Sequence, residues 1–216
     1  MKKIFAVLLT LVWLMLCAGC AGAKELTLSD KRDAESLEAL FLQDEKFQLS
    51  GLEWGISRAE AEKALGFTFT DFEPPEETEG ITFAEHPARF LGLSGTMRLG
   101  YMDDRLYIVE LIVDEGDHAK QFDALREDLF AVFGETEDRI NADEDSNSVM
   151  FMWRKEPTLL NLYYFPEDGQ IALIVGTTKI EYNTAACNPK GKHAASFCLY
   201  CSLAIAALTR SRRAGR

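Results

Sequence analysis

The sequence predicts an α+β fold, in which two tandem helix-plus-three-strand repeats form an antiparallel sheet with the helices on one face. A capped helical segment precedes alternating apolar strands twice, and each helix ends at a glycine. These glycines, Gly66 and Gly134, lie 68 residues apart, and at the same offset Ile81–Phe83 corresponds to Val149–Phe151. The order of elements repeats although few residues are identical, which favours a tandem arrangement.

Composition and charge limit the classes of partner. The chain of 216 residues is 47% apolar and 11% aromatic, which is enough for a core. Residues 21–181 hold 15 Lys and Arg against all 35 Asp and Glu, a net charge of −20, whereas residues 182–216 hold six basic residues and no acidic one. A body of this charge repels nucleic acid and anionic membranes, so we expect no nucleic-acid partner and interpret the acidity as solubilising surface.

The N-terminus has the pattern of a signal peptide. Three residues with two lysines precede an apolar run, Ile4–Leu16, that is short for a membrane-spanning helix. Ala18-Gly19-Cys20 then resembles the processing site of bacterial lipoprotein precursors, although Cys17 stands where that site usually has leucine. The resemblance implies that residues 1–19 are removed and that Cys20 carries a lipid that anchors the protein to the membrane outside the cytoplasm. The alternative is secretion with cleavage after Ala23.

Residues 20–46 are interpreted as a lipid-anchored spacer that contains one helix. Ser29-Asp30 is expected to begin this helix, which reaches about Leu42. Residues 47–180 are the predicted repeat domain, with halves at about 47–115 and 116–180.

The first half is organised around the stretch Phe47–Gly66. Trp54-Gly55 predicts a turn, Ser57–Glu60 is a capping box that begins a helix, and Gly66 is the expected C-cap. Residues 67–82, which include an acidic run around two prolines, predict a loop.

Three strands follow in this half. Ile81–Glu85 is one, and Gly95–Met102 with Leu106–Val113 predicts a hairpin that turns at Asp103-Asp104. In the last strand the alternation favours a core face made of Tyr107, Val109, Leu111 and Val113.

The second half repeats this order. Asp117 is expected to cap a helix over His118–Phe133, and an acidic loop follows at residues 140–147. Val149–Trp153 predicts a strand, and Leu159–Phe165 with Ile171–Val175 predicts a hairpin.

These motifs support a resemblance to a known family. The W-G-x-S start, the alanine-rich helix that ends in L-G and the antiparallel strands resemble the SmpA/OmlA small lipoproteins over roughly Phe47–Thr178. The tandem form is similar to the β-lactamase inhibitory protein fold, in which helices pack on one face of the sheet and the other face binds a protein. The chain lacks the cysteine pairs of secreted inhibitors with that fold, so the resemblance implies neither their partner nor their inhibitory activity.

Residue types that carry chemistry do not form a recognisable site. His86 and His118 have no neighbour at catalytic or ligand spacing. Asp143–Asn147 begins like a calcium loop, but Ser148 and Arg154 stand where glycine and glutamate are required. We therefore expect no catalytic residue, no cofactor and no metal.

The tail 181–216 differs from the body in composition, because it is basic and holds three of the five cysteines. An uncharged apolar run at 194–208 is too short for a comfortable membrane span. A disordered tail or a shifted reading frame are the favoured interpretations, and a marginal membrane contact is a third. Zinc ranks last, because only Cys198-x-x-Cys201 has familiar spacing; Cys187 and His193 are the other ligand types.

One predicted surface has the character of an interface. The strand faces opposite the expected core carry Met, Arg and aromatic side chains, which are enriched where proteins bind one another. A second packed layer is the alternative. The candidate partner-binding residues are Arg98, Met102, Glu110, Met150, Met152, Arg154, Asn161, Tyr163 and Phe165.

Together these features predict a membrane-anchored extracytoplasmic lipoprotein that is not an enzyme. We expect it to act as a protein-binding or envelope-assembly module for an extracytoplasmic protein or peptide. The alternatives are an extracytoplasmic hydrolase, which needs convergent carboxylates in a pocket, and an inhibitor or immunity protein of a secreted enzyme.

Overall fold

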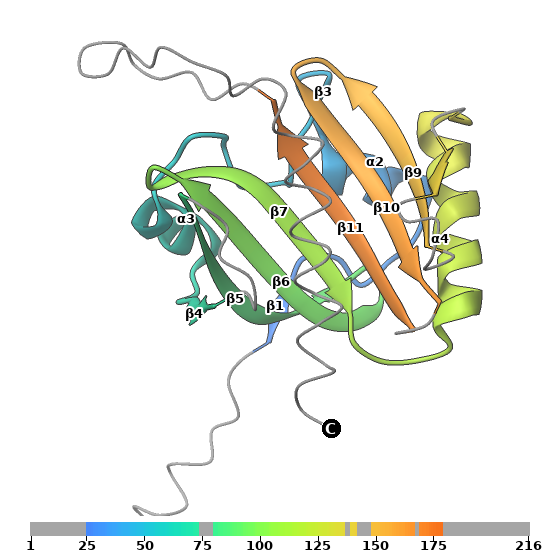
Figure 1. Cartoon of the computed structure of the whole chain (residues 1–216), viewed down its shortest axis with the longest axis horizontal. Coiled ribbons are helices and arrows are strands. Elements are labelled where there is room, and N and C mark those ends of the chain that lie inside the picture. The colour runs from blue at the N-terminus through green and yellow to red at the C-terminus, as the bar shows by residue number, and fades with distance from the viewer. Residues whose placement is uncertain (1–24, 74–79, 137–138, 142–147, 167–168, 179–216) are drawn as a thin grey trace, which may run out of the picture.

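The computed structural model describes residues 25–73, 80–136, 139–141, 148–166 and 169–178. These residues form a mixed α/β structure with three helices and a large, mainly antiparallel sheet, so the predicted fold class is confirmed at this level. The strands of the sheet follow the order β1-β5-β6-β7-β11-β10-β9-β8, with β4 also beside β5 (Figure 1). They are β1 (Leu26–Thr27), β4 (Thr70–Phe72), β5 (Ile81–Phe90), β6 (Leu93–Met102), β7 (Arg105–Val113), β8 (Arg139–Asn141), β9 (Val149–Lys155), β10 (Thr158–Phe165) and β11 (Gln170–Thr177).

Capping residues set the ends of the helices. Helix α3 (Arg58–Leu65) has the predicted capping box and ends at Gly66, whose φ is 74°. Helix α4 (His118–Phe133) is capped by Asp117, as predicted. Helix α2 (Ala34–Phe41) starts later than predicted, because the Asp33 carboxylate and not Ser29-Asp30 accepts the capping hydrogen bond, at 2.8 Å from the Ser36 N–H.

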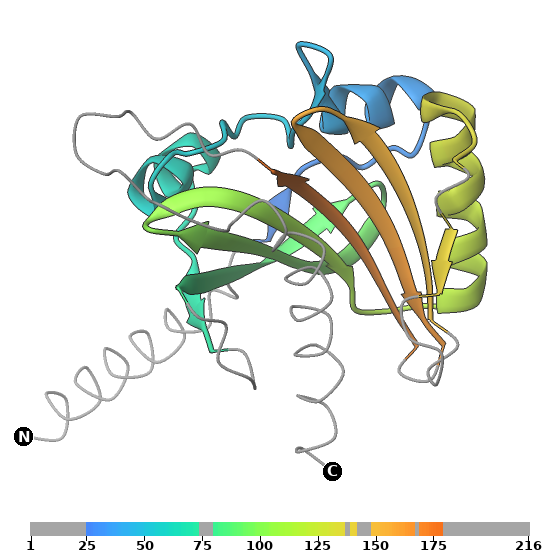
Figure 2. The same cartoon turned by 45° about the horizontal axis from the view of Figure 1, so that its top comes forward.

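All three of these helices pack on one face of the sheet. Figure 2 shows α2 and α4 beside β9 and β10, with α3 at the other end of the sheet. Their buried residues, such as Phe41, Ala61 and Leu125, belong to one cluster with the inward residues of the strands. The strand residues in this main core include Met97, Leu99, Val109, Leu111, Trp153, Leu160, Leu162, Leu173 and Val175.

Strand pairing extends the sheet beyond the predicted boundaries. Strand β5 continues to Phe90, five residues past the predicted end. Strand β4 lies within the segment predicted as a loop and pairs with Phe83–Glu85. The predicted extended stretch after Phe47 is shorter in the structure: β2 (Leu42–Gln43) and β3 (Lys46–Phe47) form a small separate hairpin.

A register shift changes one predicted face. Gly100 pairs with Ile108 while Tyr101 pairs with Leu106, so Tyr107 is the extra residue of a β-bulge. The predicted place of Tyr107 in the main core was therefore wrong. Leu106 takes that place, and Tyr107 packs on the opposite face of the sheet.

Several predictions concern residues outside the described ranges. They are the signal peptide and Cys20, the calcium-like stretch 143–147, and the tail 181–216 with its cysteines and His193. In the part of the chain that the structure describes, no helix has the length and apolarity needed to cross a membrane.

Candidate functional site

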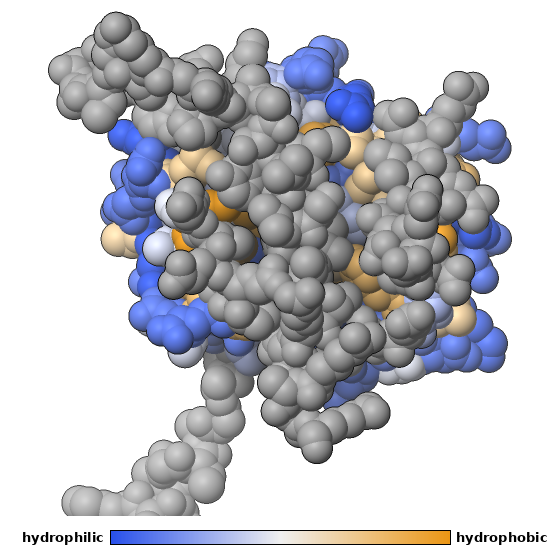
Figure 3. Space-filling model, in the orientation of Figure 1, coloured by the Kyte–Doolittle hydropathy of each residue, from blue (hydrophilic) through white to orange (hydrophobic). Residues whose placement is uncertain are grey.

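The face of the sheet opposite the helices, here called the second face, has its own apolar cluster. In Figure 3, which has the orientation of Figure 1, hydrophilic residues form the rim of the visible described surface and hydrophobic residues lie inside it. Alternation along the strands places this cluster opposite the main core. Its residues are Ile81, Phe83, Tyr107, Ile108, Ile112, Met150, Met152, Tyr163, Phe165, Ala172 and Ile174, with Phe72 and Met102 packed against them.

A row of polar side chains crosses this apolar surface at right angles to the strands. Glu85 on β5 pairs in register with Arg98 on β6, which pairs with Glu110 on β7. Ile174 on β11 continues the row, and Asn161 on β10 lies beside it. We call Glu85, Arg98, Glu110 and Asn161 the polar row.

Arg98 is held on three sides. Its Nη1 lies 3.2 Å from the Glu110 carboxylate and its Nη2 lies 3.1 Å from the Glu85 carboxylate. The guanidinium carbon lies 3.6 Å from the centroid of the Phe72 ring, within the range of a cation–π interaction. Arg98 is thus fixed in position by groups from β4, β5 and β7.

Four polar atoms of the row have no hydrogen-bond partner among the residues that the structure describes. They are the Nε of Arg98, one carboxylate oxygen of Glu110 (Oε1), and both the amide oxygen and the amide nitrogen of Asn161. Asn161 is fully buried and Glu110 is 1% exposed. Each unpaired buried polar group costs about 1–3 kcal/mol, so these atoms mark the second face as incompletely satisfied.

Burial also controls the charge of Glu110. Loss of solvent raises the pKa of the Glu110 carboxyl above its ordinary value, and the attraction of Arg98 opposes this increase without cancelling it. The row therefore holds one carboxylic acid that takes up a proton more readily than a carboxyl in water does. Replacing such a buried ion pair with apolar residues is often neutral for stability, so the pair is weak evidence for a stabilising role.

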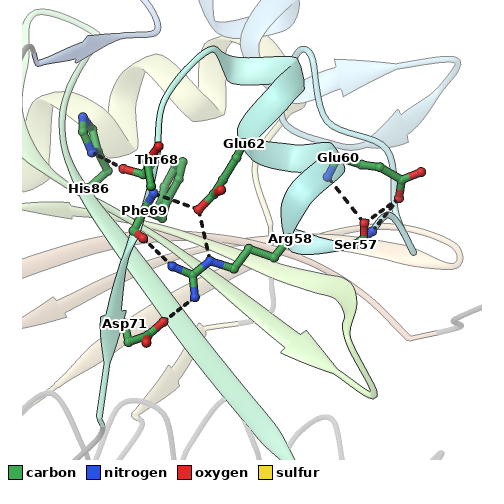
Figure 4. A network of polar contacts seen from close by, with 8 residues as sticks. All are labelled: Ser57, Arg58, Glu60, Glu62, Thr68, Phe69, Asp71 and His86. Atoms are coloured by element: carbon green, nitrogen blue, oxygen red, sulfur yellow. Dashed lines mark hydrogen bonds and ion pairs between the residues drawn. The ribbon is translucent and has the colours of Figure 1, made fainter.

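A second polar network, drawn in Figure 4, joins α3 to the start of β4, the strand that ends at Phe72. Arg58 on α3 lies 3.1 Å from Glu62 through its Nε, and it also binds Asp71 and the carbonyl oxygen of Phe69. The Glu62 carboxylate accepts a hydrogen bond from the Phe69 N–H at 3.0 Å, which lowers the pKa of Glu62. Helix α3 is thus tied to the start of β4.

The stretch Phe47–Gly66, which includes the W-G-x-S start and α3, therefore acts as a positioning element. Ser57 and Glu60 complete the capping box at the start of α3, as Figure 4 shows, and Arg58 follows directly. Asp71, the anchor of Arg58, is the neighbour in sequence of Phe72. The motif acts on the polar row indirectly, through β4.

The structure brings most of the predicted partner-binding residues together. Met150, Met152, Tyr163 and Phe165 are in the apolar cluster of the second face. The rings of Tyr163 and Phe165 are parallel, with centroids 6.0 Å apart. Arg98, Glu110 and Asn161 are in the polar row and are buried, whereas Met102 is half-buried and Arg154 is exposed.

Two residues of the site were missed by the sequence analysis. Glu85 lies on a strand that was predicted, and its spacing from Ile81 and Phe83 gives it the same face. That alternation was the available signal. Phe72 gave no such signal, because it lies in a segment predicted as a loop.

The two histidines in the described ranges, His86 and His118, take part in no recognisable chemical site. His86 packs against the rings of Phe67 and Phe69, and its Nδ1 lies 3.0 Å from the Thr68 carbonyl oxygen. His118 lies in the first turn of α4. Across the described ranges, no group of three or more His, Cys, Asp or Glu residues is arranged to hold a metal ion.

Comparison with known proteins gives one distant likeness. No protein-family model and no curated protein matches the chain. The crystal structure of a DUF4309 family protein (YjgB) from Bacillus subtilis is similar, with a TM-score of 0.45 and 10% sequence identity. The match covers 68% of this chain and 98% of that chain. A likeness this distant does not bear on function.

Proposed function

We propose that the protein is a membrane-anchored extracytoplasmic lipoprotein that binds another protein through its second face, as a non-catalytic binding or envelope-assembly module. The Ala18-Gly19-Cys20 pattern after an apolar run supports the lipid anchor. The resemblance to the SmpA/OmlA small lipoproteins agrees with it. A partner from the extracytoplasmic space, protein or peptide, is the expected ligand.

The polar row is the observation that carries the binding proposal. In a permanent core, buried donors and acceptors are nearly always paired. Here the amide of Asn161 and the Oε1 of Glu110 have no partner within the described ranges, and they lie on a face lined with aromatic and methionine side chains. A bound protein that supplies the missing hydrogen bonds would gain both affinity and selectivity.

The tandem architecture belongs to the same proposal. Each half contributes a helix, then a short strand and three longer strands (α3 with β4–β7, and α4 with β8–β11). The last strands of the two halves, β7 and β11, pair antiparallel at the centre of the sheet. The order β5-β6-β7 on one side and β9-β10-β11 on the other is what a duplicated unit would produce around a two-fold axis. We infer a repeat with halves at about 47–115 and 116–180.

The two alternatives make different demands on the same face. A hydrolase needs carboxylates that can act on a substrate, but Glu85 and Glu110 are both bound to Arg98. An inhibitor or immunity protein would use the second face as the module does, with a secreted enzyme as its partner. Identification of the partner separates these possibilities.

Site-specific photo-crosslinking in the native host tests the proposal. A photoreactive residue is placed at Met102 or Arg154, both on the second face, and at Glu127 as a control on the exposed side of α4. We expect one discrete protein crosslinked from the first two positions and not from Glu127. Addition of Asn161→Leu should abolish that product. The same products from all three positions would contradict the proposal.

A further inference from the structure

The second face is buried although none of the helices in the described ranges lies on it. Tyr163 is 2% exposed and Met152 is 4% exposed, while α2, α3 and α4 all pack on the other side of the sheet. Aromatic and methionine side chains on a sheet face require a second layer in water. The question is which part of the protein, or which partner, supplies that layer.

We propose that residues 194–208 of the same chain cover the second face, and that the bound protein displaces them. The second half of this proposal rests on the proposed function, because it requires a partner that uses the same surface. The first half stands without a partner. The segment then acts as an internal, exchangeable occupant.

The composition of the segment suits the surface. Residues 194–208 contain no Lys, Arg, Asp or Glu in 15 positions, and Phe197, Tyr200 and Leu203 recur at helical spacing. A helix of this length would extend about 22 Å. The strands of the second face that have ten residues extend about 33 Å, so the helix would fit along them.

The path of the chain permits this placement. Strand β11 lies between β7 and β10 near the centre of the sheet and ends at Thr177. The residues from 179 to 193 link this strand to the segment. A link of 15 residues can span up to about 50 Å when extended, which is ample for a return across the same sheet.

Charge complementarity favours an occupant from this chain. Lys190 and Lys192 precede the segment, and Arg210, Arg212 and Arg213 follow it. Residues 21–181 carry a net charge of −20. Basic groups at both ends of an apolar segment are attracted to such a body, and this attraction weakens with added salt.

The hydrogen-bonding capacity of the segment explains why it would be displaceable. Its side chains include Ser196, Tyr200 and Ser202 but no side-chain amide and no charged group. The amide of Asn161 remains without a partner in the structure. A protein that offers an amide to Asn161 therefore gains hydrogen bonds that the segment does not supply.

Methionine oxidation tests the cover directly. Met150 and Met152 lie on the second face, and Met97 lies in the main core. The protein that comprises residues 21–216 is compared with the same protein carrying Phe197→Asp and Leu203→Asp. Both are treated with hydrogen peroxide, and peptide mass spectrometry measures the oxidation of each methionine. We expect oxidation of Met150 and Met152 to become roughly tenfold faster in the variant, because oxidation follows exposure. Oxidation of Met97 should not change.

Matched variants keep the experiment decisive. Ala185→Asp with Ala186→Asp adds the same charge in the link and should leave all three rates unchanged. If Met97 is also oxidised faster in the first variant, the fold has been lost, and truncation after Thr178 repeats the comparison. Unchanged rates at Met150 and Met152 in both variants would overturn the proposal. Protection that disappears on dilution would also overturn it, because a second copy would then be the cover.

The crosslinking experiment separates the two proposals. If the segment and the partner compete, the Phe197→Asp/Leu203→Asp variant should give more crosslinked product from Met102 than the unmodified chain. Faster oxidation of Met150 and Met152 without any crosslinked protein would support the internal cover and reject the binding function. A crosslinked protein with unchanged oxidation rates would give the reverse result.

Discussion

At the residue scale, Asn161 gives the most direct prediction. Its amide is fully buried, and in the described part of the chain its oxygen and nitrogen have no partner. Asn161→Leu removes two unsatisfied groups at similar volume, so we expect the free energy of unfolding to rise by about 1–2 kcal/mol. Urea denaturation of the full-length protein measures this change. A loss of stability would show that the amide has a partner in the native protein.

Glu110 gives a prediction about pH. Its pKa is raised in the fold, so between pH 4.5 and the folded pKa the native state holds a proton that the unfolded chain has released. The contribution of Glu110 to stability is complete below about pH 4.5 and is lost as the pH rises through the folded pKa. Glu110→Gln lacks this dependence, so its stability relative to the unmodified protein should increase from pH 4 to pH 8.

The size of the pH effect follows from linkage. A folded pKa that is one unit higher than the unfolded one corresponds to about 1.4 kcal/mol. Denaturant unfolding at several pH values measures the difference between Glu110→Gln and the unmodified protein. Arg98→Met is the matched control, because loss of the guanidinium removes the effect that lowers the pKa of Glu110. That variant should show the steeper decline, and parallel profiles for all three proteins would contradict the assignment.

At this scale the sequence predicted on which face of the sheet a side chain lies better than it predicted which side chains contact one another. Alternation placed Met150, Met152 and Tyr163 on the same side of their strands, and the structure confirms this. It failed for Tyr107, because a bulge depends on how two strands pair and not on the local pattern. It missed Phe72 because that residue lies in a segment predicted as a loop. The contact of its ring with Arg98 depends on the contacts between α3 and β4, which no local pattern indicates.

At the element scale, Gly100 lies at the bulge in the β6–β7 hairpin, where the packed sheet leaves no room for a side chain. A Cβ at this position would lie 2.2 Å from a methyl group of Ile108 and 2.9 Å from the ring of Phe83. Both are residues of the second face, so Gly100→Ala forces these packed side chains apart. We expect a loss of about 3 kcal/mol in the free energy of unfolding, measured by thermal or urea denaturation.

Gly66→Ala is the matched control for this prediction. Gly66 has a φ of 74°, and an added Cβ there would meet no atom within 4 Å. Its cost is conformational and should be about 1 kcal/mol. Equal losses for the two variants would show that backbone conformation, and not crowding at the bulge, determines the effect at Gly100.

Elements fixed by local chemistry were predicted, and elements fixed by distant pairing were not. The capping box of α3 and the turn at Asp103-Asp104 depend on residues within four positions, and both are present. The length of β5 was underestimated, since Pro87 interrupts its pattern. Pro87 lies between the stretch of β5 that pairs with β4 and the stretch that pairs with β1. The two short strands therefore pair with β5 on either side of the proline, whose missing N–H interrupts neither pairing.

At the scale of the whole molecule, the two faces of the sheet differ in their side chains. The helix face has a continuous core that includes residues of all three described helices. The second face combines a buried ion pair with unpaired polar atoms. A sheet with helices on one side does not define an activity, because proteins with the same architecture have many functions. The proposed binding function therefore has to be tested through the side chains of the second face.

The lipid anchor is the prediction that concerns the whole molecule. If Cys20 is lipidated, Cys20→Ala should move the protein from the membrane fraction to the soluble extracytoplasmic fraction, because a covalent acyl chain supplies the apolar area that holds it on the membrane. Cell fractionation and intact-mass measurement test this, and Cys17→Ala is the control that should leave the protein anchored. Unchanged partition of Cys20→Ala would reject the anchor. A mature chain that starts at Lys24 without lipid would instead establish cleavage after Ala23, and the protein would then reach its partner by diffusion.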